Sequence, residues 1–129
     1  MVKKSIKSGR EMPAQSELYN EVVINDDSIL YFLNGKFHRI GGPAVIRYYN
    51  DGPVCYKEYY LNGKLHRIDG PAVIGYNDND SLGLEEYYIN DKRHRTNGPA
   101  EIYYNKDGSI HYERYYLNGE EVNKSEVMK

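Results

Sequence analysis

A segment of 28 residues recurs along the chain without insertion or deletion, and this recurrence limits the possible folds more than any other feature. Its most conspicuous part is Asn-Gly-Lys-x-His-Arg-x-x-Gly-Pro-Ala, at residues 34–44 and again at 62–72. A third copy occupies 90–100 with Asp91 in place of the glycine, and a fourth begins at Asn118 and then departs from the pattern. A fixed period of this length indicates structural units that stack on one another.

The apolar positions inside each unit alternate as they do in β-strands. Ala-x-Ile-x-Tyr follows the Gly-Pro of each of the three copies, and the intervening positions vary freely, which indicates a strand with one buried and one solvated face. An aromatic pair and an aliphatic residue precede each asparagine, and Asn-Asp-Gly at 50–52 and Asn-Lys-Asp-Gly at 105–108 predict tight turns. We therefore predict an all-β, elongated antiparallel meander of about three and a half 28-residue, two-stranded repeats.

The aromatic strand alternates less regularly than its partner. Tyr56 and Tyr60 would lie on one face of an ideal strand, and Tyr59 and Leu61 on the other. Two interpretations stay open, because this strand is either apolar on both faces or re-aimed by a β-bulge near Lys57 and Glu58.

The length of 129 residues accommodates one domain. We predict a single β-repeat domain over residues 17–129, with a capping strand within 17–28, repeats that start near 31, 59 and 87, and a partial repeat from 115. Residues 1–16 are expected to form a flexible N-terminal arm. The polar tail at 120–129 is expected to face water, as terminal repeats do.

Composition and charge exclude several classes of protein. The chain has 15 tyrosines and no tryptophan, so tyrosine must supply much of the buried area. A net charge of −2 argues against a protein that coats polyanions, and one cysteine, Cys55, excludes a disulfide framework and a multi-cysteine metal site. No apolar run is long enough for a membrane span, and no apolar signal core follows the lysine-rich start, so we expect a cytoplasmic protein.

Three copies of a Lys-x-His-Arg motif are the main candidate binding residues. Two strands per unit would separate equivalent residues by about 9.6 Å, too far for the histidines to share one metal ion, and we predict neither metal nor cofactor. The motif is either architectural or a basic ladder for an anionic ligand, and both interpretations stay open. We call it the Lys-His-Arg ladder; it comprises Lys36, His38, Arg39, Lys64, His66, Arg67, Lys92, His94 and Arg95.

Tyr60 and Tyr88 are further candidates, because aromatic faces can stack on nucleic-acid bases. The alternative is that such tyrosines supply buried area to a thin sheet. Catalysis has little support, because no serine, threonine or cysteine nucleophile recurs beside the histidines. We therefore predict that the protein is not an enzyme.

The run Tyr-Tyr-Leu-Asn-Gly-Lys-x-His, clearest at Asn62, Gly63, Lys64 and His66, resembles the variant MORN repeats over roughly residues 29–119. Typical MORN units are shorter and place glycine after the histidine. The chain is more similar to a longer His-Arg-x-x-Gly-Pro-Ala repeat class of bacterial, phage and large-virus proteins. The resemblance implies elongated single-layer sheets that serve as interaction, dimerisation or membrane-proximal scaffolds without catalysis, and a related bacterial group acts as antitoxins.

These observations together predict a non-enzymatic module that binds a host or partner protein. The resemblance adds an expected role as an inhibitor, antitoxin or phage counter-defence (anti-CRISPR-like) factor, in the host cell cytoplasm if phage-encoded. A homodimer through an edge or a face stays open. The alternative function is binding of a nucleotide or nucleic acid by the Lys-His-Arg ladder and the tyrosines.

Overall fold

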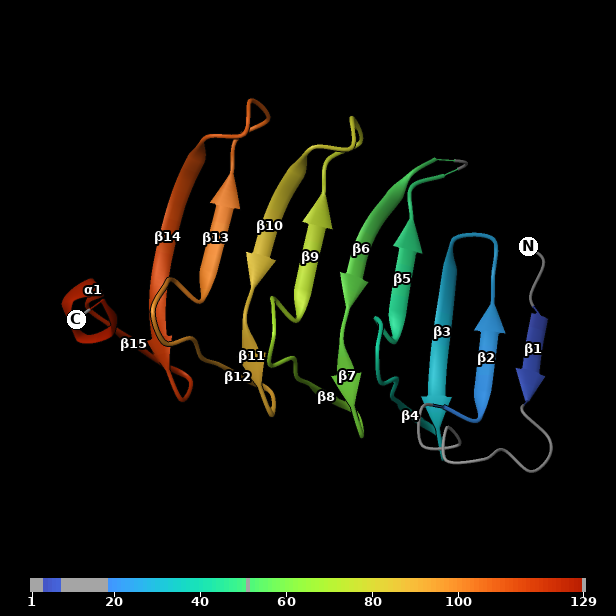
Figure 1. Ribbon diagram of the computed structural model, residues 1–129. Helices are drawn as coiled ribbons and strands as arrows, with labels where there is room; N and C mark the ends of the chain where they lie inside the picture. Colours follow the sequence, from blue (N-terminus) through green and yellow to red (C-terminus); the bar gives the residue numbers. More distant parts are fainter. Residues whose placement is uncertain (1–3, 8–18, 51, 129) are drawn as a thin grey trace.

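The computed structural model describes residues 4–7, 19–50 and 52–128, and their main sheet is an antiparallel meander (Figure 1). The strands lie side by side in one layer, with β1 at one end and β15 and helix α1 at the other. The predicted all-β meander is therefore confirmed. In sheet order its strands are β1 (Lys4–Lys7), β2 (Glu21–Ile24), β3 (Ser28–Leu33), β5 (Val45–Tyr48), β6 (Val54–Glu58), β9 (Val73–Tyr76), β10 (Leu82–Glu86), β13 (Glu101–Tyr104), β14 (Ile110–Leu117) and β15 (Glu120–Val122).

Short hairpins at one end of the long strands were not expected from the sequence, and two of them form separate two-stranded sheets (Figure 1). In the central unit the hairpin strands are β7 (Tyr60–Leu61) and β8 (Lys64–Leu65). Asn62 and Gly63 close this hairpin at φ values of 50° and 82°, the pair of positive angles that a type I′ turn requires. Equivalent hairpin strands are β4 (Lys36–Phe37), which pairs with β3, and β12 (Lys92–Arg93), which pairs with β11 (Tyr88–Ile89).

A β-bulge and a break explain the irregular alternation of the aromatic strand. Arg47 pairs with Tyr56 but Tyr48 pairs with Val54, so Cys55 is an extra residue on β6. The same shift occurs at the positions equivalent to Cys55 in β10 and β14, Gly83 and His111. The bulge thus lies at Cys55 rather than at Lys57 and Glu58, and a second irregularity at Tyr59 separates β6 from β7.

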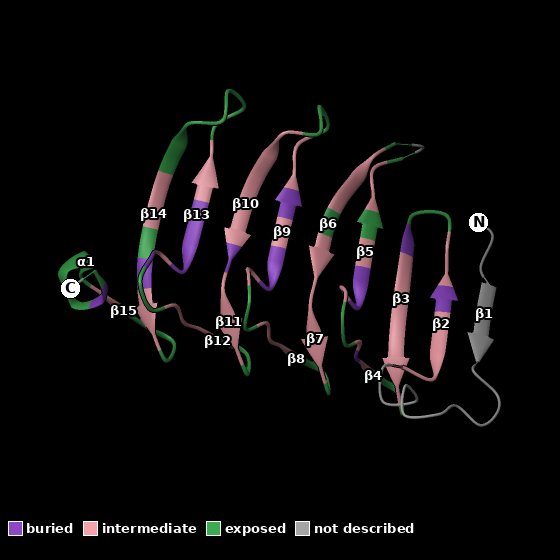
Figure 2. Cartoon of the chain, viewed as in Figure 1, coloured by how far each residue is buried: buried purple, intermediate pink, exposed green. Residues whose placement is uncertain are grey.

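The most buried residues lie where β5, β9 and β13 begin (Figure 2). Ala44, Ala72 and Ala100 have no exposed surface, and neither has Val45. The backbone of each alanine is bonded on both sides; Tyr59 N–H donates to Ala72 C=O, for example, and Ala72 N–H donates to Glu86 C=O. The alanines thereby join consecutive units at the centre of the sheet.

The two ends of the sheet are closed differently. β2 lies within 17–28, where the sequence predicts a capping strand, but it is not the edge of the sheet, because it pairs with both β1 and β3. Most of the arm expected over 1–16 falls outside the described residues, and its described part is β1. At the other end, α1 (Lys124–Val127) starts with a capping box between Asn123 and Glu126. In the ranges described, no helix has the length and apolar character needed to cross a membrane.

Candidate binding face

The histidines of the ladder tie each unit to the next. The Nδ1 atom of His38 accepts the backbone N–H of Asn62 at 2.9 Å, and the same bond joins His66 to Asn90 at 3.1 Å. His94 accepts from Asn118 at 2.9 Å, again 24 residues along the chain. An Nδ1 that accepts a hydrogen bond carries no proton, so this arrangement places the ring proton on Nε2. Each asparagine opens the next hairpin turn, so the bond fixes the position of that hairpin.

Asn20 takes the place of a histidine at the start of the array. No ladder histidine precedes the first unit, and there the backbone N–H of Asn34 donates to Asn20 Oδ1 at 3.1 Å. The Asn20 amide also donates to Asn34 Oδ1 at 3.0 Å. This role could not be predicted, because Asn20 lies outside the recurring motif.

The arginines of the ladder are held flat between a tyrosine ring and a glycine. The Cζ atoms of Arg39, Arg67 and Arg95 each lie 4.0 Å above the centroid of a tyrosine ring in their own unit. A Cβ added to the nearby glycine would lie only 2.7–2.9 Å from Cζ, so any other residue there would displace the guanidinium. Each guanidinium also donates through Nη1 to the carbonyl of the following proline. These contacts account for Arg-x-x-Gly-Pro as a structural motif.

We expect Gly98→Ala to lower the free energy of unfolding by about 1–2 kcal/mol, because the methyl group displaces Arg95 from Tyr87 and from the Pro99 carbonyl. Urea denaturation of the single and double variants measures the coupling with Arg95→Ala. Without the guanidinium the methyl group has room, so Gly98→Ala should cost less in the Arg95→Ala background. Equal costs in both backgrounds would show that the arginine does not explain the glycine.

The lysines of the ladder project into solvent along the hairpin edge. Lys36, Lys64 and Lys92 are exposed, and no ion pair is recorded for them among the described residues. The stems of Lys36 and Lys92 lie beside the next hairpin turn, since a Cβ added to Gly63 would be 3.6 Å from Lys36 Cβ and one added to Gly119 would be 3.5 Å from Lys92 Cβ. The lysines are therefore a row of solvated charges, separate from the arginine stacks.

Two open pockets lie between successive connections of the repeat. The first, of about 550 Å³, has Tyr59 and Leu61 among its lining residues and lies between residues 39–42 and 66–69. The second, of about 430 Å³, is lined by Tyr87 and Ile89 and lies between 67–70 and 94–96. We call the surface formed by residues 39–42, 66–70 and 94–96 and these two pockets the loop face.

The ridge between the two pockets exposes an isoleucine. Ile68 has 84% of its surface exposed, and Ile40, at the far wall of the first pocket, has 48%. Beside Ile68, the Nε atom of Arg67 donates to Asp69 Oδ1 at 3.2 Å. A large aliphatic side chain this exposed, between two hollows, is typical of an interaction surface.

Tyr60 and Tyr88 do not line the pockets of the loop face. Tyr60 packs against Phe37, with ring centroids 5.1 Å apart, and Tyr88 donates to Glu86 at 3.4 Å. Burial and the Glu58 carboxylate raise the pKa of Tyr60, and burial together with Glu86 raises the pKa of Tyr88 to about 12. Both phenols are part of the packing around the hairpins. We call the side of the sheet that carries β4, β8 and β12 the hairpin face.

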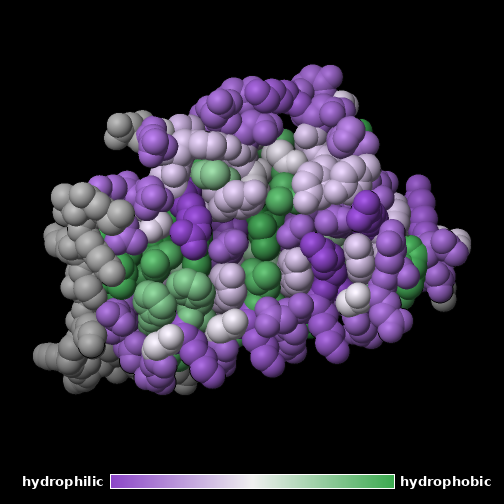
Figure 3. Space-filling view, turned by 180° about the vertical axis from the view of Figure 1, so that it is seen from behind, coloured by the Kyte–Doolittle hydropathy of each residue, from purple (hydrophilic) through white to green (hydrophobic). Residues whose placement is uncertain are grey.

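The hairpin face changes character along the sheet (Figure 3). Hydrophobic side chains gather toward the N-terminal strands and the middle of this view, and hydrophilic ones toward the C-terminal strands. The sequence shows why, because Phe37 and Leu65 of the first two hairpins correspond to Arg93 in the third. Likewise Val73 corresponds to Glu101.

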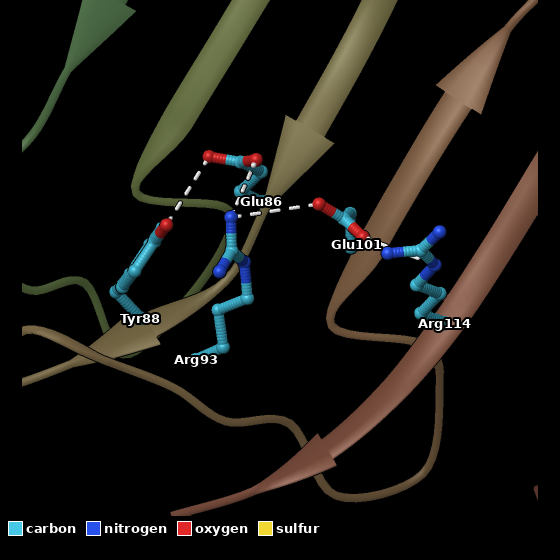
Figure 4. Close-up of polar contacts among 5 residues, drawn as sticks. All are labelled: Glu86, Tyr88, Arg93, Glu101 and Arg114. Atoms are coloured by element: carbon cyan, nitrogen blue, oxygen red, sulfur yellow. Dashed lines mark hydrogen bonds and ion pairs between the residues drawn. The ribbon is translucent and has the colours of Figure 1, made fainter. Parts of the chain in front are cut away.

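A buried charge cluster occupies the C-terminal part of the hairpin face (Figure 4). Glu86 and Glu101 lie opposite each other on β10 and β13, with 11% and 6% of their side chains exposed. Arg93 lies between them, with Nη2 3.3 Å from Glu86 Oε2 and 3.5 Å from Glu101 Oε2. Arg114 approaches Glu101 at 3.8 Å. Arg93 thus reduces the repulsion between two carboxylates in a buried site, and Arg114 supplies the second positive charge.

The predicted site residues therefore separate into three groups. Histidines hold adjacent hairpins, and two of them, His66 and His94, also line the loop-face pockets beside the arginines. Lysines line the hairpin edge, and Tyr60 and Tyr88 lie outside the pockets. Within the described part of the chain, no three His, Cys, Asp or Glu side chains are grouped to hold a metal ion. Comparison with family models, curated proteins and solved structures finds no significant match. Function is therefore inferred from the geometry of these surfaces.

Proposed function

We propose that the protein is a non-enzymatic binding module that holds another protein against the loop face. The observation that carries this proposal is the exposed Ile68 on the ridge between two equivalent pockets. Full burial of an isoleucine side chain contributes roughly 1.5–3 kcal/mol, so a partner that covers this ridge gains affinity from Ile68 alone.

The arginines stacked on tyrosine rings also favour the loop face as the binding surface. Arg39, Arg67 and Arg95 are already immobilised on tyrosine rings, so little side-chain entropy is lost when a partner contacts them. Arginine and tyrosine are also the residue types that carry much of the energy of protein interfaces. An immobile, mixed aromatic and cationic surface suits recognition of a protein segment.

The biological role of this module is proposed from the resemblance to MORN-like repeats. We propose an inhibitor, antitoxin or phage counter-defence factor that acts in the cytoplasm by covering a surface of its target. Such a role requires binding alone, which agrees with a loop face built from stacked, hydrogen-bonded side chains.

A second candidate function is nucleic-acid binding, favoured by the exposed row Lys36, Lys64 and Lys92. Phosphate contacts would make such binding strongly dependent on salt. One observation counts against it: Tyr60 and Tyr88 are packed around the hairpins and so are not free to stack on bases. We therefore rank it below protein binding.

Ile68→Asp tests the proposed function. Because Ile68 is almost fully exposed, the change should leave the fold intact and weaken partner binding at least tenfold. Immobilised wild-type protein and variant are compared for the proteins they retain from cells in which the chain occurs, with cross-linking to map the contact. Ile110→Asp is the matched control, since Ile110 is also exposed, at 52%, and lies on β14 outside both pockets.

Three outcomes would contradict protein binding at the loop face. Equal retention by wild type and Ile68→Asp, or cross-links that map to another surface, would exclude the ridge as the contact. Retention of nucleic acid that disappears on raising the salt concentration, and on replacing the three lysines, would favour the second candidate function instead.

A further inference from the structure

We infer that the occupant of the loop face is a proline-rich segment in the polyproline II conformation, with apolar residues at positions i and i+3 and carboxylates beside them. The inference rests on the proposed function, because it takes the loop face as the binding surface, and it adds the conformation and chemical class of the ligand.

The spacing of the two pockets selects the conformation. Each unit contributes two strands to the main sheet, so the pockets repeat about every 9.6 Å across the strands. A polyproline II helix has three residues per turn and rises about 3.1 Å per residue. It therefore returns the same face every 9.3 Å or so, within about 0.3 Å of the pocket repeat.

Other regular conformations fit this spacing less well. A β-strand returns a side chain to the same face after two residues, about 6.6 Å, or after four, about 13 Å. An α-helix rises about 5.4 Å per turn, so its nearest match spans two turns and about 10.8 Å. Of these three conformations, only polyproline II has a repeat that matches the spacing of the pockets, so it alone presents one apolar side chain to each pocket.

The chemistry of the pockets fits a proline-rich ligand. Tyr59 and Leu61 line the first pocket and Tyr87 and Ile89 the second, so each offers an aromatic and an aliphatic surface to a pyrrolidine ring. Aromatic-lined grooves are a recurrent way to bind polyproline II segments. Ile68, on the ridge, would lie between the two inserted residues.

The guanidinium groups of the loop face supply hydrogen-bond donors and positive charge for such a ligand. A polyproline II segment has no internal hydrogen bonds, so its carbonyls need donors. Arg39, Arg67 and Arg95 each have five N–H donors, of which the described contacts use one or two. Three arginines against one carboxylate, Asp69, leave the loop face cationic, which favours carboxylates in the ligand.

Two synthetic peptides of equal composition test the inference on the full chain labelled with ¹⁵N. One is four repeats of Glu-Pro-Ala, which places a proline at every third position; the other has the same residues with prolines spaced alternately by two and four. We expect the regular peptide to shift the amide resonances of the pocket residues and to bind at least tenfold more tightly than the permuted peptide.

The variants separate this inference from the proposed function. Ile68→Asp should weaken binding of the regular peptide at least tenfold, and Ile110→Asp should leave it unchanged. No shift at the loop face with millimolar peptide, or equal affinity for both peptides, would overturn the inference. If Ile68→Asp then still abolishes retention of a cellular partner, protein binding stands without the polyproline ligand; if it does not, the proposed function fails as well.

Discussion

Replacing Arg93 with leucine is expected to lower the free energy of unfolding by about 2–4 kcal/mol. The variant leaves Glu86 and Glu101 opposite each other, both largely buried, without the guanidinium between them. Removal of one partner from a buried ion pair is costly because the remaining charge keeps its desolvation penalty. Arg93 is about one-third exposed, which places the effect below that of a fully buried pair. Guanidinium chloride denaturation followed by circular dichroism measures it.

The preceding unit of the chain supplies the control for this prediction. Leu65 and Val73 occupy there the positions of Arg93 and Glu101. The double variant Arg93→Leu, Glu101→Val removes one of the two buried carboxylates and restores the apolar pair of the preceding unit. We expect it to recover at least about 1 kcal/mol of the stability lost in Arg93→Leu, while Glu86 keeps its own desolvation penalty. A double variant as unstable as Arg93→Leu alone would show that the charge cluster is not the source of the loss.

His38→Ala is expected to lower the free energy of unfolding by about 2–3 kcal/mol. His38 has only 5% of its surface exposed. Loss of its imidazole leaves a cavity and removes the acceptor of the Asn62 N–H. Each of these losses is worth roughly 1–3 kcal/mol, and partial access of water to Asn62 reduces their sum. Thermal and urea denaturation of the purified variant measure the change.

His38→Asn separates the hydrogen bond from the packing. Asparagine Oδ1 can accept the Asn62 N–H, as Asn20 Oδ1 accepts that of Asn34. We expect the asparagine variant to recover at least 1 kcal/mol relative to His38→Ala, in the range of one net hydrogen bond. His111→Ala, at an exposed bulge position, should change stability by less than about 0.5 kcal/mol. Equal losses for alanine and asparagine at position 38 would contradict the role of Nδ1 as an acceptor.

The meander was predictable because strand alternation and turn residues act locally. Ala-x-Ile-x-Tyr predicts a strand from its own spacing, and the recurrence of this pattern predicts that the strands stack. The short hairpins were not predicted, although Asn62 and Gly63 favour a type I′ turn, because two-residue strands such as β8 are too short to show alternation.

The contacts of the ladder could not be predicted, because they depend on register between units. Recurrence shows that a unit requires His66 and Arg67, but not that the first contacts Asn90 and the second packs against Tyr59. The charge cluster depends on register too, since Glu86 and Glu101 meet only when β10 and β13 are aligned. The pockets of the loop face arise from the spacing between consecutive connections, which no single unit contains.

We infer that the ladder histidines serve to hold adjacent hairpins together and are not free ligand-binding groups. Detection of scalar coupling across their N–H···N hydrogen bonds is the sharpest test of this role. In the uniformly ¹⁵N-labelled protein, the structure predicts a coupling between the Asn62 amide nitrogen and His38 Nδ1, and equivalent couplings for Asn90 with His66 and Asn118 with His94. The imidazole ¹⁵N shifts should show the proton on Nε2. Protonated Nδ1 atoms without such couplings would contradict this role, and the histidines would then be available to bind a ligand.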